Sequence, residues 1–168
     1  MAPKLEHCMT VRGYIAVGGD VLQIDNVLNG ARRVFIAVTG GFVKGVGPAA
    51  GLEADIHPAS SDGLLLNPST NTAHLNVRFA ARSSSGDVIY TEYQGILKVT
   101  EAGQKVLAGS PEAKSTAYGD QEWFISPRIE TSSDKFKWME ETVWLGQGHW
   151  VVDEKGSAVE YEVYRAVN

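Results

Sequence analysis

The chain has 168 residues, of which 43% are hydrophobic and 21% charged, and its formal net charge is −5. This length and composition predict one globular domain, residues 1–168, that is large enough to bury a core. The acidic balance argues against a nucleic-acid partner, because phosphate binding needs clustered Lys and Arg, and the longest basic run is Arg32-Arg33.

Cysteine content and hydropathy favour a reducing, cytosolic location. Cys8 is the single cysteine, so the chain has neither an internal disulfide nor a CxxC metal site. The first residues lack the apolar core of a signal peptide, and no segment approaches about 18 consecutive apolar residues. We therefore expect a protein that does not enter a membrane.

The first part of the chain is predicted to form short strands. Its glycines separate runs rich in Val, Ile, Tyr, Phe and Trp, which is typical of all-β proteins. Gly40-Gly41 is interpreted as a tight corner and the segment Ser60 to Gly63 as a turn. The expected strands cover residues 10–17, 34–39, 42–45, 52–57 and 64–66.

Residues 73–94 show the clearest pattern, that of a β-hairpin turned at residues 83–87. Side chains on a strand alternate between its two faces. One face of the first strand is apolar and holds Ala73, Leu75, Val77, Phe79 and Ala81. The other face is mixed and holds His74, Asn76, Arg78, Ala80 and Arg82. The returning strand, residues 88–94, alternates in the same way.

The second part of the chain is predicted to hold one short helix and the last strands. Ser110-Pro111-Glu112-Ala113 combines an N-cap, a proline at the first helical position and an early acid. We expect one or two turns there, ending before Gly119, and a further helical turn at 131–137. The expected strands cover residues 123–130, 138–145, 150–153 and 159–167.

A chain of about eight to ten strands with one or two short helical turns must protect its sheet edges. Closure into a barrel removes those edges. The predicted fold is therefore all-β, a closed and mostly antiparallel β-barrel, with a two-sheet sandwich as the alternative.

The sequence leaves open which strand face lines the barrel lumen. The apolar face can fill the interior, which leaves Arg78 and His74 in water. Alternatively, the mixed face lines a cavity. The second interpretation is favoured by the residue types on the mixed faces, which include Tyr90, Glu92 and Arg128. It is also favoured by the four tryptophans near the C-terminal end, since tryptophan is common in ligand pockets.

The second interpretation yields candidate site residues. We expect Glu92 and Glu130 to transfer protons, and Arg78 or Arg128 to stabilise an enolate or phenolate. For each of these four, a surface ion pair is the alternative. The expected substrate-binding residues are His74, Tyr90, Trp123, Phe124, Trp138, Glu140 and Tyr161. The spacing of the histidines predicts no metal site, and no nucleotide-binding or nucleophile motif is present, so no cofactor is expected.

The order and spacing of several short motifs resemble the DUF3237 family, also called UPF0311, over nearly the whole chain. These motifs are Thr39-Gly40-Gly41, Asp62-Gly63, residues 78–95, Pro127-Arg128-Ile129-Glu130-Thr131, residues 136–140, Val143 to Gly146 and Val159 to Tyr164. Two positions depart from the family pattern: Ile129 stands where an aromatic residue is usual, and Glu140 where an asparagine is usual. The second departure marks a divergent substrate, because it adds a charge.

The resemblance implies a closed, calycin-like barrel and an accessory role in bacterial or fungal metabolism. By analogy with small barrels in such settings, we expect a cofactor-independent cyclase or isomerase acting on a small apolar or aromatic natural product. The alternatives are a non-catalytic carrier with the same pocket, or an interaction module with a solid core. A lumen of at least about 300 Å³ would exclude the solid core. Exposed apolar strands also favour a homodimer.

Overall fold

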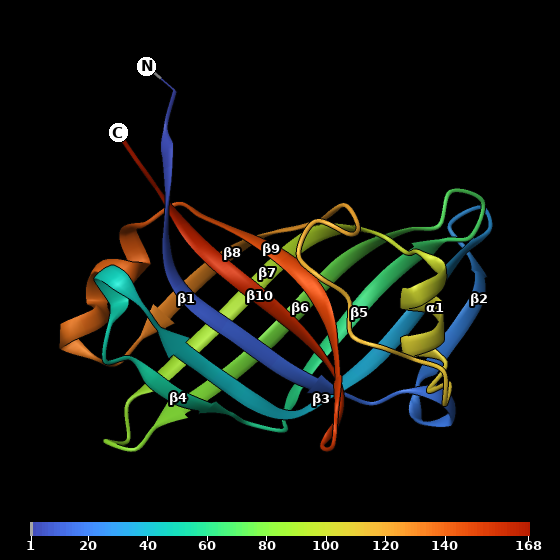
Figure 1. Cartoon of the computed structure of the whole chain (residues 1–168), viewed down its shortest axis with the longest axis horizontal. Coiled ribbons are helices and arrows are strands. Elements are labelled where there is room, and N and C mark those ends of the chain that lie inside the picture. Colours follow the sequence, from blue (N-terminus) through green and yellow to red (C-terminus); the bar gives the residue numbers. More distant parts are fainter. Residues whose placement is uncertain (1) are drawn as a thin grey trace.

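The computed structural model describes residues 2–168, and in this part of the chain ten strands belong to one antiparallel sheet. The sheet closes on itself, because β1 (Lys4–Ile15) pairs on one side with β10 (Gly156–Val167) and on the other with β3 (Ala31–Gly45). Figure 1 shows the tilted strands wrapping around a common axis. The predicted all-β barrel is confirmed.

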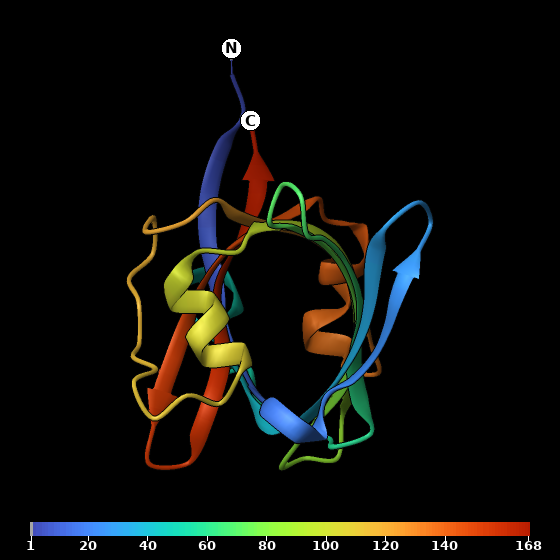
Figure 2. The same ribbon diagram turned by 90° about the vertical axis from the view of Figure 1, so that its right-hand side faces the viewer.

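The rest of the wall follows from the strand pairings. From β10 it continues through β9 (Trp144–Asp153), β8 (Trp123–Thr131), β7 (Val88–Lys98) and β6 (Thr72–Ser83). The short strands β4 (Glu53–Ile56) and β5 (Ser60–Asn67) each join β6 to β3, and so close the ring at its two ends. The strand β2 (Leu22–Val27) pairs with β3 in a hairpin that extends away from the ring (Figure 2).

Short helices lie at the two ends of the barrel. Helix α1 (Glu101–Leu107) lies at one end, close to the 3₁₀ turn η1 (Gly18–Asp20). The 3₁₀ segments η2 (Gly47–Ala49) and η3 (Asp134–Glu141) lie towards the opposite end (Figure 1). No helix within residues 2–168 is long and apolar enough to cross a membrane.

The prediction of a helix after Ser110 is wrong. The segment forms a single turn, in which the Ser110 side chain accepts from the Glu112 backbone N–H at 3.1 Å. The helix begins ten residues earlier, where the Thr100 side chain caps it by accepting from the Gly103 N–H. Ser110 does make the hydrogen bond expected of an N-cap. The chain beyond it has no apolar face to bury, so the helix does not continue there, whereas α1 buries Val106.

Three boundaries are also corrected. Ser60 to Gly63 is not a turn but the start of β5, and the expected strand from Trp138 begins only at Trp144. Gly40-Gly41 is not a corner, because β3 runs through it. Gly41 has φ +132°, and a Cβ there would lie 1.9 Å from the Arg12 carbonyl oxygen, so this glycine permits close approach of β1.

The apolar alternate residues face the barrel interior. On β6, Leu75, Val77 and Phe79 are buried, whereas His74 and Arg78 are exposed. This settles the question that the sequence leaves open: the apolar faces point inwards and the mixed faces outwards.

Candidate active site

A cavity of about 370 Å³ occupies the α1 end of the lumen. This volume is within the range of small-molecule sites, about 300–1,000 Å³, and it excludes the solid-core interpretation. Most of the wall is aliphatic. The aliphatic lining residues are Ile15, Val21, Val34, Ile36, Val38, Leu64, Leu66, Ala73, Leu75, Val77, Leu97, Val99, Leu107, Ala108 and Val159.

The mouth of the cavity lies between α1 and the start of β3. Gln104 of α1, Arg32 of β3 and Asn71 of the β5–β6 turn all line it. Figure 2 looks at this end of the molecule, with α1 and η1 at the rim of the ring of strands. The polar groups at the rim contrast with the aliphatic wall.

Asp62 is the one carboxylate that lines the cavity within residues 2–168. On β5 it shares the inward face with Ser60 and Leu64, and its Oδ1 accepts from the Asn76 backbone N–H at 3.0 Å. Burial raises the pKa of Asp62 to about 6, although the hydrogen bond from Asn76 acts in the opposite direction. A carboxylate with this pKa can both take up and release a proton near neutral pH.

Two tyrosines face the same space as Asp62. Val77 pairs with Asp62 on one side and with Tyr93 on the other, so all three lie in one row across the wall. The Tyr93 hydroxyl donates to the Tyr161 hydroxyl at 3.3 Å, and the two rings meet edge to face. This leaves the Tyr161 proton available for a bound molecule.

Both tyrosines remain neutral at physiological pH. Burial raises the pKa of Tyr93 well above its ordinary value, and the neighbouring Tyr161 and Asp62 raise it further. Burial also raises the pKa of Tyr161, outweighing the opposing hydrogen bond from Tyr93. The pair therefore supplies O–H donors beside a carboxylate in an apolar chamber.

Trp123 and Trp150 form the aromatic part of the wall, with ring centroids 4.6 Å apart. Trp123 also meets Tyr161 edge to face. Gly148 makes room for this cluster, because a Cβ there would lie 2.7 Å from both the Trp123 and the Tyr161 rings. The absence of a side chain at Gly148 thus leaves room for the ring of Tyr161, which carries one of the two hydroxyl groups.

The four residues expected to be catalytic lie on the outer surface. Arg78, Glu92 and Arg128 form one row across β6, β7 and β8. The Glu92 carboxylate is 3.7 Å from Arg78 Nε and 4.0 Å from Arg128 Nη1. Glu130 is also exposed and pairs with Tyr90, in the next outward-facing row beyond Glu92 and Arg128. The structure brings three of the four together in an outer groove, and their chemical roles stay predictions.

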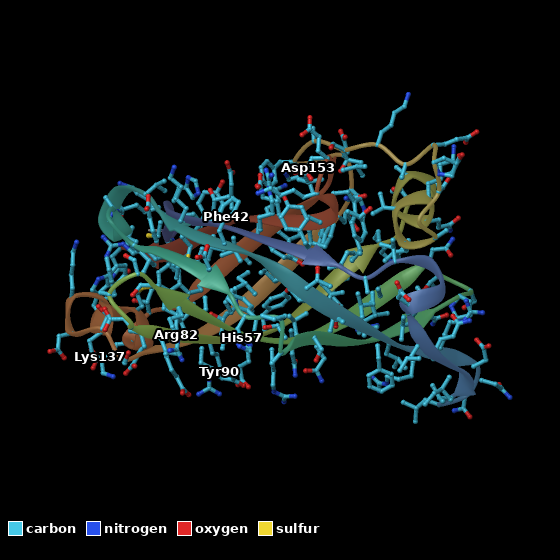
Figure 3. All side chains as sticks on the ribbon, turned by 90° about the horizontal axis from the view of Figure 1, so that it is seen from below. Phe42, His57, Arg82, Tyr90, Lys137 and Asp153 are labelled. Carbon is cyan, nitrogen blue, oxygen red and sulfur yellow. The ribbon has the colours of Figure 1, made fainter. Side chains whose placement is uncertain are left out.

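The expected substrate-binding residues divide into two groups. Trp123 and Tyr161 line the lumen. The other five lie outside it: His74, Tyr90, Phe124, Trp138 and Glu140. Their placement in the lumen is corrected, because each belongs to an outward face or to η3. Figure 3 shows Tyr90 at the outer surface of the barrel.

Glu140 has a structural contact rather than a place in the pocket. Its Oε1 accepts from the Thr131 backbone N–H and pairs with Lys137, both at 2.9 Å. These bonds, the first of them above all, lower the pKa of Glu140. The carboxylate therefore fixes η3 against the end of β8.

Asp62 and Tyr93 are the site residues that sequence reasoning missed. The Ser-Ser-Asp-Gly run at residues 60–63 predicts a turn, so the sequence does not indicate Asp62 as a site residue. The available signal was alternation: Ser60, Asp62, Leu64 and Leu66 share a face, which places an acid among apolar residues. Within residues 2–168, no three His, Cys, Asp or Glu side chains converge as metal ligands.

Comparison with known proteins identifies relatives of this chain. The family model DUF3237, described as protein of unknown function, matches residues 3–166. A UPF0311 protein from Bradyrhizobium diazoefficiens is 26% identical over 148 residues, which cover 86% of this chain and 88% of that protein.

Solved structures share the fold. A protein of unknown function from Rhodopseudomonas palustris has a TM-score of 0.80 and 21% identity, with 99% of both chains covered. A β-barrel-like protein from Acinetobacter baumannii has a TM-score of 0.72 and 20% identity, covering 99% of this chain and 98% of that one. An enzyme from Penicillium herquei has a TM-score of 0.55 and 14% identity, covering 99% and 96%.

Proposed function

Because the chain belongs to the DUF3237 family, whose function is unknown, we propose its function from the lumen: cofactor-independent proton transfer on a small, largely apolar carbonyl compound. The observation that carries this proposal is Asp62, an acid with a raised pKa that lies beside two neutral tyrosines in an apolar cavity. The fold-level likeness to a fungal enzyme is in keeping with catalysis.

In the proposed reaction, ionised Asp62 removes a proton from the carbon next to a carbonyl group. The C–H electron pair becomes the C=C bond of the enolate and the C=O π pair moves onto the oxygen, where the Tyr161 hydroxyl, supported by Tyr93, donates a hydrogen bond. In a substrate with a C=C bond conjugated to the enolate, Asp62 then returns the proton to the far carbon of that system. The carbonyl group re-forms, which gives isomerisation. Alternatively, the enolate carbon attacks a second carbonyl group of the same molecule. The π pair of that C=O bond moves onto its oxygen, which takes the proton from Asp62, and this gives cyclisation. Neither path needs an oxidant or reductant.

The aliphatic walls contribute by excluding water. In a dry chamber the carboxylate is a stronger base and the hydroxyl donors stabilise the enolate more than they would in water. Proton transfer by a positioned group contributes about 10²–10⁴-fold, and one donor to a developing oxyanion about 10²–10³-fold. A non-catalytic carrier would use the same walls without needing Asp62.

The test is exchange of the α-protons of 1-tetralone into D₂O, followed by proton NMR. We expect the native protein to accelerate exchange and Asp62→Asn to reduce the acceleration at least about 100-fold. Glu92→Gln, on the outer face of the neighbouring strand β7, is the matched control and is expected to retain it. If Glu92→Gln lost the acceleration of exchange and Asp62→Asn kept it, the reaction would take place in the outer groove and not in the lumen. Binding of the ketone without exchange would favour a carrier.

A further inference from the structure

The cavity lining carries two formal charges of opposite sign at different depths. Among the lining residues within 2–168, Arg32 and Asp62 are the charged ones. Arg32 pairs with Leu66 across β3 and β5, and Asp62 lies four residues from Leu66 on the same strand. At about 3.3 Å per residue, the two backbone positions are about 13 Å apart along the wall.

Arg32 is placed to meet one end of a ligand. Its Nε is paired with Asp25 of the β2–β3 hairpin, and 42% of its side chain remains exposed at the mouth. A guanidinium group has two further nitrogens that donate in a fork matching a carboxylate. The amides of Gln23, Asn71 and Gln104 line the same cavity and add donors near this end.

We propose that the lumen takes amphipathic carboxylic acids, with the acid group on Arg32 at the mouth and the apolar body inside. This inference rests on the proposed function, since it places the reacting carbon at Asp62 and Tyr161, about 10 Å or more from the acid group. The opposite orientation is disfavoured, because an anion beside ionised Asp62 would be repelled in a low-dielectric chamber.

The chain supplies its own control in the next residue. Arg33 faces outwards on β3 and donates from Nη1 to the Gly63 carbonyl at 2.8 Å. Arg32→Gln and Arg33→Gln remove the same charge from neighbouring positions, but only the first changes the cavity. Net charge and long-range attraction of anions are therefore matched between the two variants.

The experiment measures displacement of N-phenyl-1-naphthylamine, a neutral fluorescent probe, by decanoate, 1-decanol and decylamine. In the native protein and in Arg33→Gln, decanoate is expected to displace the probe at a concentration about tenfold lower than decanol. In Arg32→Gln this preference is expected to disappear, while the protein still binds the neutral probe, which shows that the lumen is folded. Arg32→Lys is expected to restore part of the preference.

Three results would overturn the inference: a preference unaffected by Arg32→Gln, an equal loss in Arg33→Gln, or strongest displacement by decylamine. The last would place a cation at Asp62 instead. The outcome is separable from the proton-transfer proposal. If the protein prefers acids but exchanges no ketone α-protons, the Arg32 subsite stands and the proton-transfer proposal fails. If it exchanges α-protons but shows no preference for acids, the proton-transfer proposal stands and the acid-binding inference fails.

Discussion

Asp62 is the residue on which the proposed chemistry depends, and its ionisation opposes folding. In the folded chain its pKa is raised from 3.8 to about 6, so the folded state holds the proton more tightly than the unfolded state does. The stability associated with that proton is complete below the unfolded pKa and is lost as pH rises through the folded pKa. At neutral pH the protein therefore carries a destabilising carboxylate, as is common at functional sites.

Asp62→Asn is expected to raise the free energy of unfolding at pH 8 by about 2–3 kcal/mol, because the amide removes the buried charge and still accepts from the Asn76 N–H. At pH 5 the gain is expected to shrink, since much of Asp62 is then protonated. Urea unfolding at the two pH values measures the difference. An equal effect at both, or a loss of stability at pH 8, would contradict the raised pKa.

At the scale of elements, Gly148 of β9 determines the shape of the aromatic wall. A methyl group there would lie 2.7 Å from Trp123 and from Tyr161, two side chains that are almost wholly buried and have little room to move. The packing between β8, β9 and β10 therefore requires glycine at this position.

Gly148→Ala is expected to lower stability by about 2 kcal/mol and to weaken binding of N-phenyl-1-naphthylamine, because it displaces the lumen wall. Gly19→Ala is the matched control: a Cβ there meets nothing within 4 Å, so its effect should stay within about 0.5 kcal/mol. Thermal unfolding and probe titration measure both variants. Equal effects of the two substitutions would show that the aromatic cluster adapts freely.

Strands were predictable wherever alternation was strong, and the polar site was not. The hairpin of β6 and β7 follows from its alternating residues, and the closed barrel follows from many strands that need edge protection. The sequence favours a lumen lined by the mixed faces because Arg78, Glu92 and Arg128 resemble a catalytic group, whereas in the structure these residues form an outward row. The sequence does not predict Asp62 as a site residue, because a turn motif and a strand that begins with polar residues have the same composition.

At the scale of the whole molecule, the outer face of β7 and β8 has the features of a subunit interface. Ile96 and Phe124 pair across the two strands and are 42% and 46% exposed. On one side lies the pair Glu92 and Arg128, and on the other Lys98 and Glu122. A two-fold axis between the rows of Gln94 and Ile96 would bring Arg128 opposite the Glu122 of a second copy, and Glu92 opposite its Lys98.

This self-complementary pattern predicts a homodimer through the face of β7 and β8. Phe124→Glu is expected to give monomers in sedimentation velocity, because it buries a charge at the centre of the contact. Arg128→Glu alone should weaken the dimer, and Arg128→Glu combined with Glu122→Arg should restore it. A native protein that stays monomeric at about 100 μM, or a double variant no better than the single one, would contradict this arrangement.

The most direct test of the lumen as the functional site is a carbon-13 NMR titration of the Asp62 carboxyl group, assigned by its loss in Asp62→Asn. Free protein is expected to titrate with a pKa of about 6, and addition of 2-naphthol, a neutral phenol resembling an enol, is expected to raise that pKa by excluding water from the cavity. A carboxyl group that titrates near 4 and does not respond to 2-naphthol would be an ordinary solvated acid. That result would contradict the proposed role of Asp62 in the lumen.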